Sequence, residues 1–190
     1  MIFNSLVFLV FLAVVLGLYY RLGHRAQNHL LVLASYVFYG WWDWRFLGLL
    51  LFTTFFDYWC ALRLERETDA GKKKSFLAMS MAMNLTVLGF FKYFNFFADS
   101  LEKLFAVLGF HADMPTLQIL LPVGISFYTF LSMSYTIDVY RGKLKATHNV
   151  LDFMLYVSFF PHLVAGPIVR AQDLLPQCAR PRIIRTDQVV

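Results

Sequence analysis

Long apolar segments joined by short polar loops constrain the fold of this chain of 190 residues more than any other feature. Leu, Val, Phe, Tyr, Trp and Met dominate five segments, at residues 2–20, 29–42, 46–64, 75–97 and 122–140. A helix rises about 1.5 Å per residue, so segments 2–20 and 122–140 would each reach about 28 Å. The hydrocarbon core of a bilayer is about 30 Å thick. We therefore expect an all-α, polytopic transmembrane helical bundle.

The composition favours lipid over water as the surrounding medium. Hydrophobic residues make up 59% of the chain, against about 45–50% in soluble domains. The 21 Phe, 10 Tyr and 4 Trp fit this reading, because aromatic rings gather at both membrane interfaces. The net charge of +5 does not indicate a nucleic-acid partner, since no basic stripe is interleaved with stacking aromatics. The two cysteines, Cys60 and Cys178, lack the spacing of a zinc site, and we expect no metal.

The Lys and Arg residues gather on alternate loops, which sets the expected orientation. Of the 17, 14 lie in or beside loops 21–28, 65–74 and 141–149 or in the tail after residue 169, whereas Arg45 and Lys103 lie on the opposite side. Because Lys and Arg are retained in cytoplasmic loops, we expect those three loops to face the cytoplasm. The N-terminus then lies outside, in a multi-pass protein of the cell inner (plasma) membrane.

The segment at residues 150–169 has a different character. It is apolar overall, but it is interrupted by Asp152, Pro161, His162, Gly166 and Pro167. A full crossing would place the arginines of the tail outside, so we expect a re-entrant segment that enters from the cytoplasm and returns. Irregular backbone at membrane depth must be surrounded by protein or a water-filled cavity, and such segments often line a reaction chamber or a permeation path. An ordinary kinked helix is the alternative.

Two charged residues fall inside the apolar segments, where charge is costly and a functional role is the default hypothesis. Asp57 lies deep within segment 46–64 and should face the protein interior or a wet cavity. Lys92 lies near the outer end of segment 75–97, where its long side chain can reach the headgroups. Their depths differ, so we do not expect a direct ion pair between them.

Four stretches occur in a fixed order: FKYFNF at 91–96, LPVGISFY at 121–128, YTIDVYRG at 135–142 and FPHLVAGPIVR at 160–170. In this order they resemble the N-terminal half of the membrane-bound O-acyltransferase (MBOAT) family, with the closest likeness to the bacterial alginate O-acetyltransferase branch. The aromatic run at 36–44 resembles that branch as well. Each stretch alone is weakly specific, but the ordered set is specific and covers essentially the whole chain.

The resemblance implies a fold and an activity. The family's helical bundle surrounds a central chamber that re-entrant segments help to line. Through it an acyl group passes from a cytoplasmic donor, such as acetyl-CoA, toward a hydroxyl-bearing acceptor. In the alginate branch the group is acetyl and the acceptor is an exopolysaccharide. The lipid bilayer, periplasmic acetylation proteins and polysaccharide export proteins are the implied partners, and no bound cofactor is implied.

The same resemblance limits what these residues do alone. The family's catalytic histidine lies in its C-terminal half, so we expect an N-terminal portion that is truncated, inactive by itself, and exposes polar positions such as Asp57 to lipid. His162 matches the histidine of the FPHLVAGP motif and is not assigned as the catalytic residue. The resemblance places it instead in a cytoplasmic funnel with Gly166, Pro167 and Arg170. Arg170 would suit a phosphate-bearing donor, or would anchor the chain at the interface.

Two other functions stay open. D-alanyl transfer to teichoic acid belongs to the same family. A polysaccharide transporter or flippase subunit would also need polar groups at membrane depth. The sequence contains no P-loop, GxSxG, HExxH or GxGxxG signature that would favour a further enzyme class.

Overall fold

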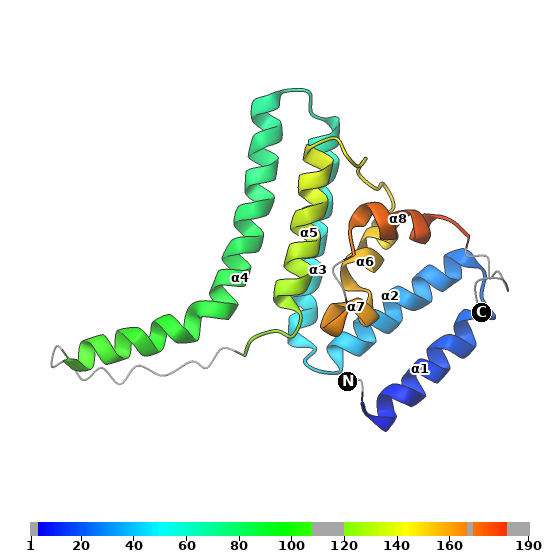
Figure 1. Cartoon of the computed structure of the whole chain (residues 1–190), viewed down its shortest axis with the longest axis horizontal. Helices are drawn as coiled ribbons and strands as arrows, with labels where there is room; N and C mark the ends of the chain where they lie inside the picture. The colour runs from blue at the N-terminus through cyan, green and yellow to red at the C-terminus, as the bar shows by residue number, and fades with distance from the viewer. Residues whose placement is uncertain (1–3, 108–119, 167–168, 182–190) are drawn as a thin grey trace.

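The computed structural model describes residues 4–107, 120–166 and 169–181, and within these ranges every regular element is an α-helix (Figure 1). In chain order the helices are α1 (Leu6–Tyr19), α2 (His24–Gly40), α3 (Arg45–Arg66), α4 (Ala70–Val107), α5 (Ile125–Tyr140), α6 (Val150–Ser158), α7 (Phe160–Ala165) and α8 (Ala171–Ala179). The prediction of an all-α fold is confirmed for this part of the chain.

Each predicted apolar segment coincides with a helix. Segments 2–20, 29–42, 46–64, 75–97 and 122–140 overlap α1 to α5, and the segment at 150–169 overlaps α6 and α7. Helix α3 and the part of α4 from Ala70 to Phe105 are long and apolar enough to cross a membrane, by length and composition. A membrane helical protein is therefore supported, and membrane crossing by the shorter helices stays a prediction.

Helices α3, α4 and α5 stand side by side, and α2, α6 and α8 form a second group packed against them (Figure 1). Aromatic side chains fill the space between the two groups. The ring of Tyr135 on α5 lies 4.7 Å from that of Phe153 on α6, centroid to centroid. Tyr156 packs beside Phe153 and donates a hydrogen bond to the carbonyl of Leu131 at 3.2 Å. These contacts anchor α6 to the layer of α3, α4 and α5.

The segment at 150–169 breaks into two helices at Phe159, whose backbone is extended in ψ (φ −53°, ψ 110°). Asn149 caps the first of them by accepting a hydrogen bond from the amide of Leu151 at 3.1 Å. The second begins with Pro161 in its first turn, where a missing N–H is tolerated. The amide of Phe160 donates to Ser35 Oγ of α2 at 3.1 Å, which fastens the break to the bundle.

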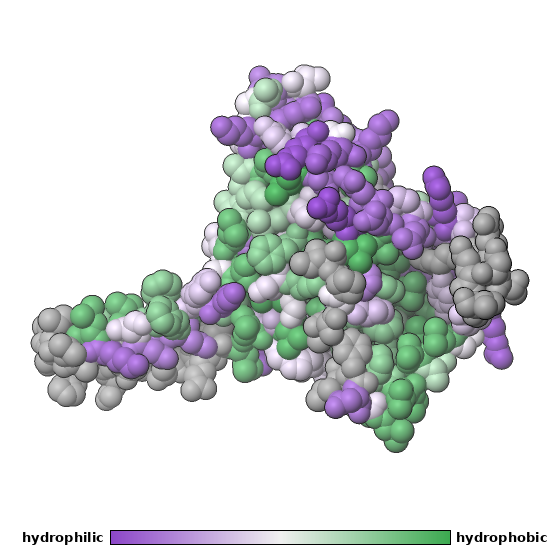
Figure 2. Space-filling view, viewed as in Figure 1, coloured by the Kyte–Doolittle hydropathy of each residue, from purple (hydrophilic) through white to green (hydrophobic). Residues whose placement is uncertain are grey.

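Large apolar side chains cover the outer flanks of α3 and α4, and the most exposed of them include Phe52, Phe55, Leu85 and Phe90. Figure 2 shows hydrophilic residues gathered at the end of the molecule where α3 ends and α4 begins, with hydrophobic residues over the flank below. Soluble monomers rarely expose contiguous apolar surface of this kind. The pattern is typical of a protein whose flank faces lipid and whose end faces water.

Helix α4 bends away from α3 and α5, so that its last turns leave the bundle (Figure 1). The predicted segment 75–97 therefore ends inside this helix, which continues to Val107. In the last turns Phe97, Leu101 and Leu104 recur at helical spacing and are 61%, 48% and 52% exposed. The other face carries Asn95, Asp99 and Lys103. This projecting part of α4 is amphipathic, with its apolar face uncovered by the rest of the described chain.

Two of the four sequence motifs meet at Gly124, the residue before α5. Gly124 adopts a left-handed backbone conformation (φ 77°), which a residue with a Cβ rarely takes. A Cβ built there would lie 2.6 Å from the carbonyl oxygen of Leu163, in the FPHLVAGP motif. Glycine is therefore required both by the turn that starts α5 and by the close approach of α7.

We predict that Gly124→Ala destabilises the fold more than Gly142→Ala. Gly142 is also left-handed (φ 68°), but no atom lies within 4 Å of its built Cβ, so its substitution costs the backbone strain alone, about 1 kcal/mol. The contact with Leu163 should add about 2 kcal/mol to the cost at Gly124, because backbone must shift. Unfolding of the chain in detergent measures both losses, and equal losses would contradict the close contact.

Candidate functional site

A fully buried carboxylate, that of Asp57 on α3, is the centre of a polar cluster between α3, α4 and α5. Ser80 Oγ donates to Asp57 Oδ1 at 2.6 Å. Asn84 Nδ2 lies 2.9 Å from Oδ1 and 2.8 Å from Oδ2 of the same carboxylate. Ser80 and Asn84 are one turn apart on α4, so their side chains leave the same face. Thr136 of α5 joins the cluster through Ser80, with 3.4 Å between the hydroxyl oxygens.

This cluster gives the buried carboxylate its donors from within the described chain. Hydrogen bonds between membrane helices contribute about 0.6–2 kcal/mol each, and an unpaired buried charge costs several. The expectation that the chain alone exposes Asp57 to lipid is wrong, because α4 and α5 cover it. Asp57 faces the interior of the bundle.

Lys92 lies apart from this cluster, exposed on the flank of α4. Its Nζ atom is 5.6 Å from the ring centroid of Tyr93. The ion pairs found among the described residues do not include one between Lys92 and Asp57. An exposed ammonium beside an aromatic ring suits a side chain that reaches toward headgroups.

A second polar cluster joins α2, α6 and α8. Asn28, 5% exposed, donates from Nδ2 to Asp152 Oδ1 at 3.0 Å and to the carbonyl oxygen of Cys178 at 2.8 Å. Asn149 Nδ2 donates to the other carboxylate oxygen of Asp152 at 2.8 Å. Asn28 therefore holds the first turn of α6 beside the last turn of α8.

The predicted funnel residues are only partly brought together. His162 is half-buried on α7, with its ring edge-on to that of Phe159 at 5.1 Å. Gly166 packs so closely that a Cβ would lie 2.6 Å from the Cα of His162, which explains the glycine of the motif. Arg170 is exposed at the start of α8, and no hydrogen bond or ion pair of the described residues joins its side chain to His162 or Gly166. Pro167 lies outside the described residues.

Sequence reasoning singled out charged residues and the histidine, and it missed their neutral partners. Ser80 and Asn84 carry a signal that could have identified them, because two polar residues at i and i+4 in an apolar run share one helix face. Asn28 carries no such signal. Its partner Asp152 is 124 positions away in the sequence, so only the tertiary structure reveals the contact.

The described residues offer little that could hold a metal ion, since no group of three or more His, Cys, Asp or Glu side chains converges among them. Arg25 and Asp152 line a cavity together with His24, His29 and Asn28. The lining therefore offers one cation and one carboxylate with hydrogen-bonding neighbours.

Curated proteins with similar sequences are named as O-acetylases or O-acetyltransferases. The "Probable alginate O-acetylase AlgI" of Pseudomonas aeruginosa is 50% identical over 181 residues, and that of Azotobacter vinelandii is 48% identical over 181 residues. The "Peptidoglycan O-acetyltransferase" of Helicobacter pylori is 31% identical over 207 residues. Each match covers 93% of this chain. No family model and no solved structure matches it.

These relatives confirm the resemblance to the alginate O-acetyltransferase branch that the four ordered motifs indicated. The chain spans about a third of their length, namely 34% of the P. aeruginosa protein, 36% of the A. vinelandii protein and 38% of the H. pylori protein.

We predict that Asn84→Leu lowers the free energy of unfolding by about 3 kcal/mol, because it leaves the carboxylate of Asp57 buried without its amide donor. The double variant Asp57→Leu/Asn84→Leu should be more stable than Asn84→Leu, since removing both partners leaves no unpaired charge. Unfolding in detergent measures both, with Met79→Leu on the outer face of α4 as the neutral control. A double variant less stable than the single would contradict this role of the cluster.

Proposed function

We propose that this chain, a homologue of the alginate O-acetylases, forms part of a membrane-bound O-acyltransferase that passes acetyl groups to an exopolysaccharide such as alginate. The proposal concerns the complete protein and is carried by the 50% identity over 181 residues with the P. aeruginosa alginate O-acetylase. The 31% identity with a peptidoglycan O-acetyltransferase also favours acetyl as the group transferred. The match to this relative makes peptidoglycan the second candidate acceptor.

The proposed arrangement places the protein in the inner membrane with its N-terminus outside. The basic residues Arg63, Arg66 and Lys72 to Lys74 lie where α3 ends and α4 begins, at the hydrophilic end of the molecule (Figure 2). On the opposite side Arg45 is neutralised by Asp43, with Nη2 2.6 Å from Oδ2. The excess of unpaired positive charge at one end supports a cytoplasmic location for that end.

The second polar cluster supports the re-entrant arrangement of residues 150–169. Asn28 binds both Asp152, in the first turn of α6, and Cys178, in the last turn of α8. The chain therefore returns after α7 to the level at which α6 began, as Figure 1 shows. A kinked helix that crossed the membrane once would end at the far side instead.

The projecting part of α4 fits the opposite membrane surface. Its axis turns away from the upright helices, and its exposed apolar face includes Phe97, Leu101 and Leu104 (Figure 1). A helix with one apolar and one polar face lies in the plane of the interface, with the apolar side among the acyl chains. We place this part of α4 on the outer leaflet.

Acyl transfer to a hydroxyl needs a base, donors for the negative charge that develops on oxygen, and exclusion of water. We assign the base to a histidine in the part of the complete protein that this chain does not span. His162, Gly166, Pro167 and Arg170 would instead shape the cytoplasmic funnel through which the donor enters. The guanidinium of Arg170 would attract a phosphate-bearing donor such as acetyl-CoA. Periplasmic acetylation and export proteins would then receive the modified polymer or supply it.

We predict that membranes carrying the complete protein transfer radiolabelled acetyl groups to alginate, and that membranes from a deletion strain do not until the gene is restored. Arg170→Gln should raise the donor concentration for half-maximal rate about tenfold with little change in maximal rate. Arg180→Gln is the matched control in the same polar tail. Unchanged acetylation with altered polymer export would support a transporter subunit instead, and labelled alanine on teichoic acid would support D-alanyl transfer.

We also predict the orientation of the loops. Alkaline phosphatase fused within residues 67–74 should be inactive and green fluorescent protein fused there should fluoresce, because that loop faces the cytoplasm. The reverse pattern is expected for fusions at residues 41–44. An active phosphatase at residues 67–74 would overturn the arrangement.

A further inference from the structure

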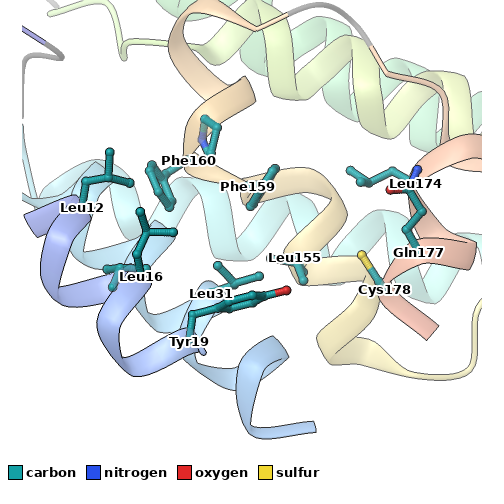
Figure 3. A pocket seen from close by; sticks show the side chains of 12 residues that line it. Leu12, Leu16, Tyr19, Leu31, Leu155, Phe159, Phe160, Leu174, Gln177 and Cys178 are labelled. Atoms are coloured by element: carbon teal, nitrogen blue, oxygen red, sulfur yellow. The ribbon is translucent and has the colours of Figure 1, made fainter. Parts of the chain in front are cut away.

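Two cavities adjoin along the helices α2, α6 and α8. The first, about 300 Å³, lies between these helices, α7 and α1, and its lining is apolar, with Leu12 and Leu16 on the α1 side (Figure 3). The second, about 330 Å³, lies at the start of α2 and α6, and its lining is polar. Cys178 borders both. Leu31 lies one turn beyond Asn28 on α2, and Leu155 one turn beyond Asp152 on α6, so the apolar cavity continues from the polar one.

The polar cavity is lined by one cation, Arg25, and one carboxylate, Asp152. His24 and His29 also line it, and the N-terminal ends of α2 and α6, the positive ends of their dipoles, lie beside it. His29 Nδ1 donates to the carbonyl oxygen of Arg25 at 2.7 Å, which fixes the orientation of the His29 ring.

The same cavity also offers an acceptor, the carboxylate of Asp152. Asn28 and Asn149 each donate one amide N–H to it, at 3.0 Å and 2.8 Å. A carboxylate has about four acceptor sites, so it can take a further N–H donor. A ligand that fits both charged groups carries an anionic group and an N–H donor a few atoms apart.

We propose that the two cavities together bind one phospholipid whose headgroup combines a phosphate with a primary ammonium. The phosphate would lie against Arg25, the ammonium would donate to the carboxylate of Asp152, and one acyl chain would enter the apolar cavity beside Leu16. A soluble phosphate compound would leave that apolar cavity unfilled. In the orientation proposed above, loops 21–28 and 141–149 face the cytoplasm, so the lipid belongs to the inner leaflet. This site is independent of acetyl transfer, and its test has no catalytic readout.

The test is native mass spectrometry of the delipidated 190-residue chain titrated with phosphatidylethanolamine, phosphatidylcholine or phosphatidylglycerol of the same acyl chains. We expect one phosphatidylethanolamine per chain, bound at least tenfold more tightly than phosphatidylcholine, whose ammonium has no N–H. Arg25→Gln and Leu16→Trp should each weaken binding about tenfold. Arg21→Gln and Leu9→Trp, on the same helices or loop but outside both cavities, are the matched controls.

Thermal unfolding without lipid shows whether the variants keep the fold of the parent chain. Equal binding of the three lipids, or equal effects of the cavity variants and their controls, would overturn the site. Glycerophosphoethanolamine carries the headgroup without acyl chains. If it displaced the lipid at similar concentration and Leu16→Trp had no effect, the cavity would take a soluble phosphate compound, and the lipid assignment would be wrong.

Discussion

The hydrogen bonds from Ser80 and Asn84 to the carboxylate of Asp57 are the interaction on which the rest of the structure depends. They fix α4 against α3, and Thr136 adds α5 to the same cluster. In lipid the hydrophobic effect between helices is weak, so polar contacts of this kind carry specificity that apolar packing cannot supply. The three upright helices thereby become a rigid wall against which α6 and α7 can pack.

Close backbone contacts then position the irregular segment on that wall. Gly124 allows α7 to approach the start of α5, and Gly166 allows the chain to turn tightly over His162. Asn28 holds the two ends of the segment at one level. Gly124 and Gly166 have no room for a larger side chain, and Asn28 joins two elements. The position of the irregular segment therefore follows from a few fixed residues rather than from general hydrophobic packing.

Helix positions could be read from the sequence because apolar runs such as 46–64 reflect a local requirement for length in lipid. The helix break near Pro161 could also be predicted from the sequence, since proline and glycine act on the local backbone. The sequence predicts that Asp57 faces the protein interior, whereas the resemblance implies that the chain alone exposes it to lipid. These two predictions conflict because hydrogen-bond donors on another helix cannot be identified from a local sequence pattern. The bend of α4 was missed for the same reason, since its apolar run continues through the bend. The partners of Asn28 depend on contacts between distant segments.

The central claim is that the exposed apolar flank faces lipid while the opposite face of α3 buries its carboxylate. Trp59 tests it, since it is 42% exposed on α3, two positions from Asp57. In a variant with Phe at the other three tryptophan positions, reconstituted in vesicles, bromine atoms on lipid acyl chains should quench Trp59 emission strongly and aqueous iodide should quench it weakly. Strong quenching by iodide with no effect of brominated lipid would contradict the account.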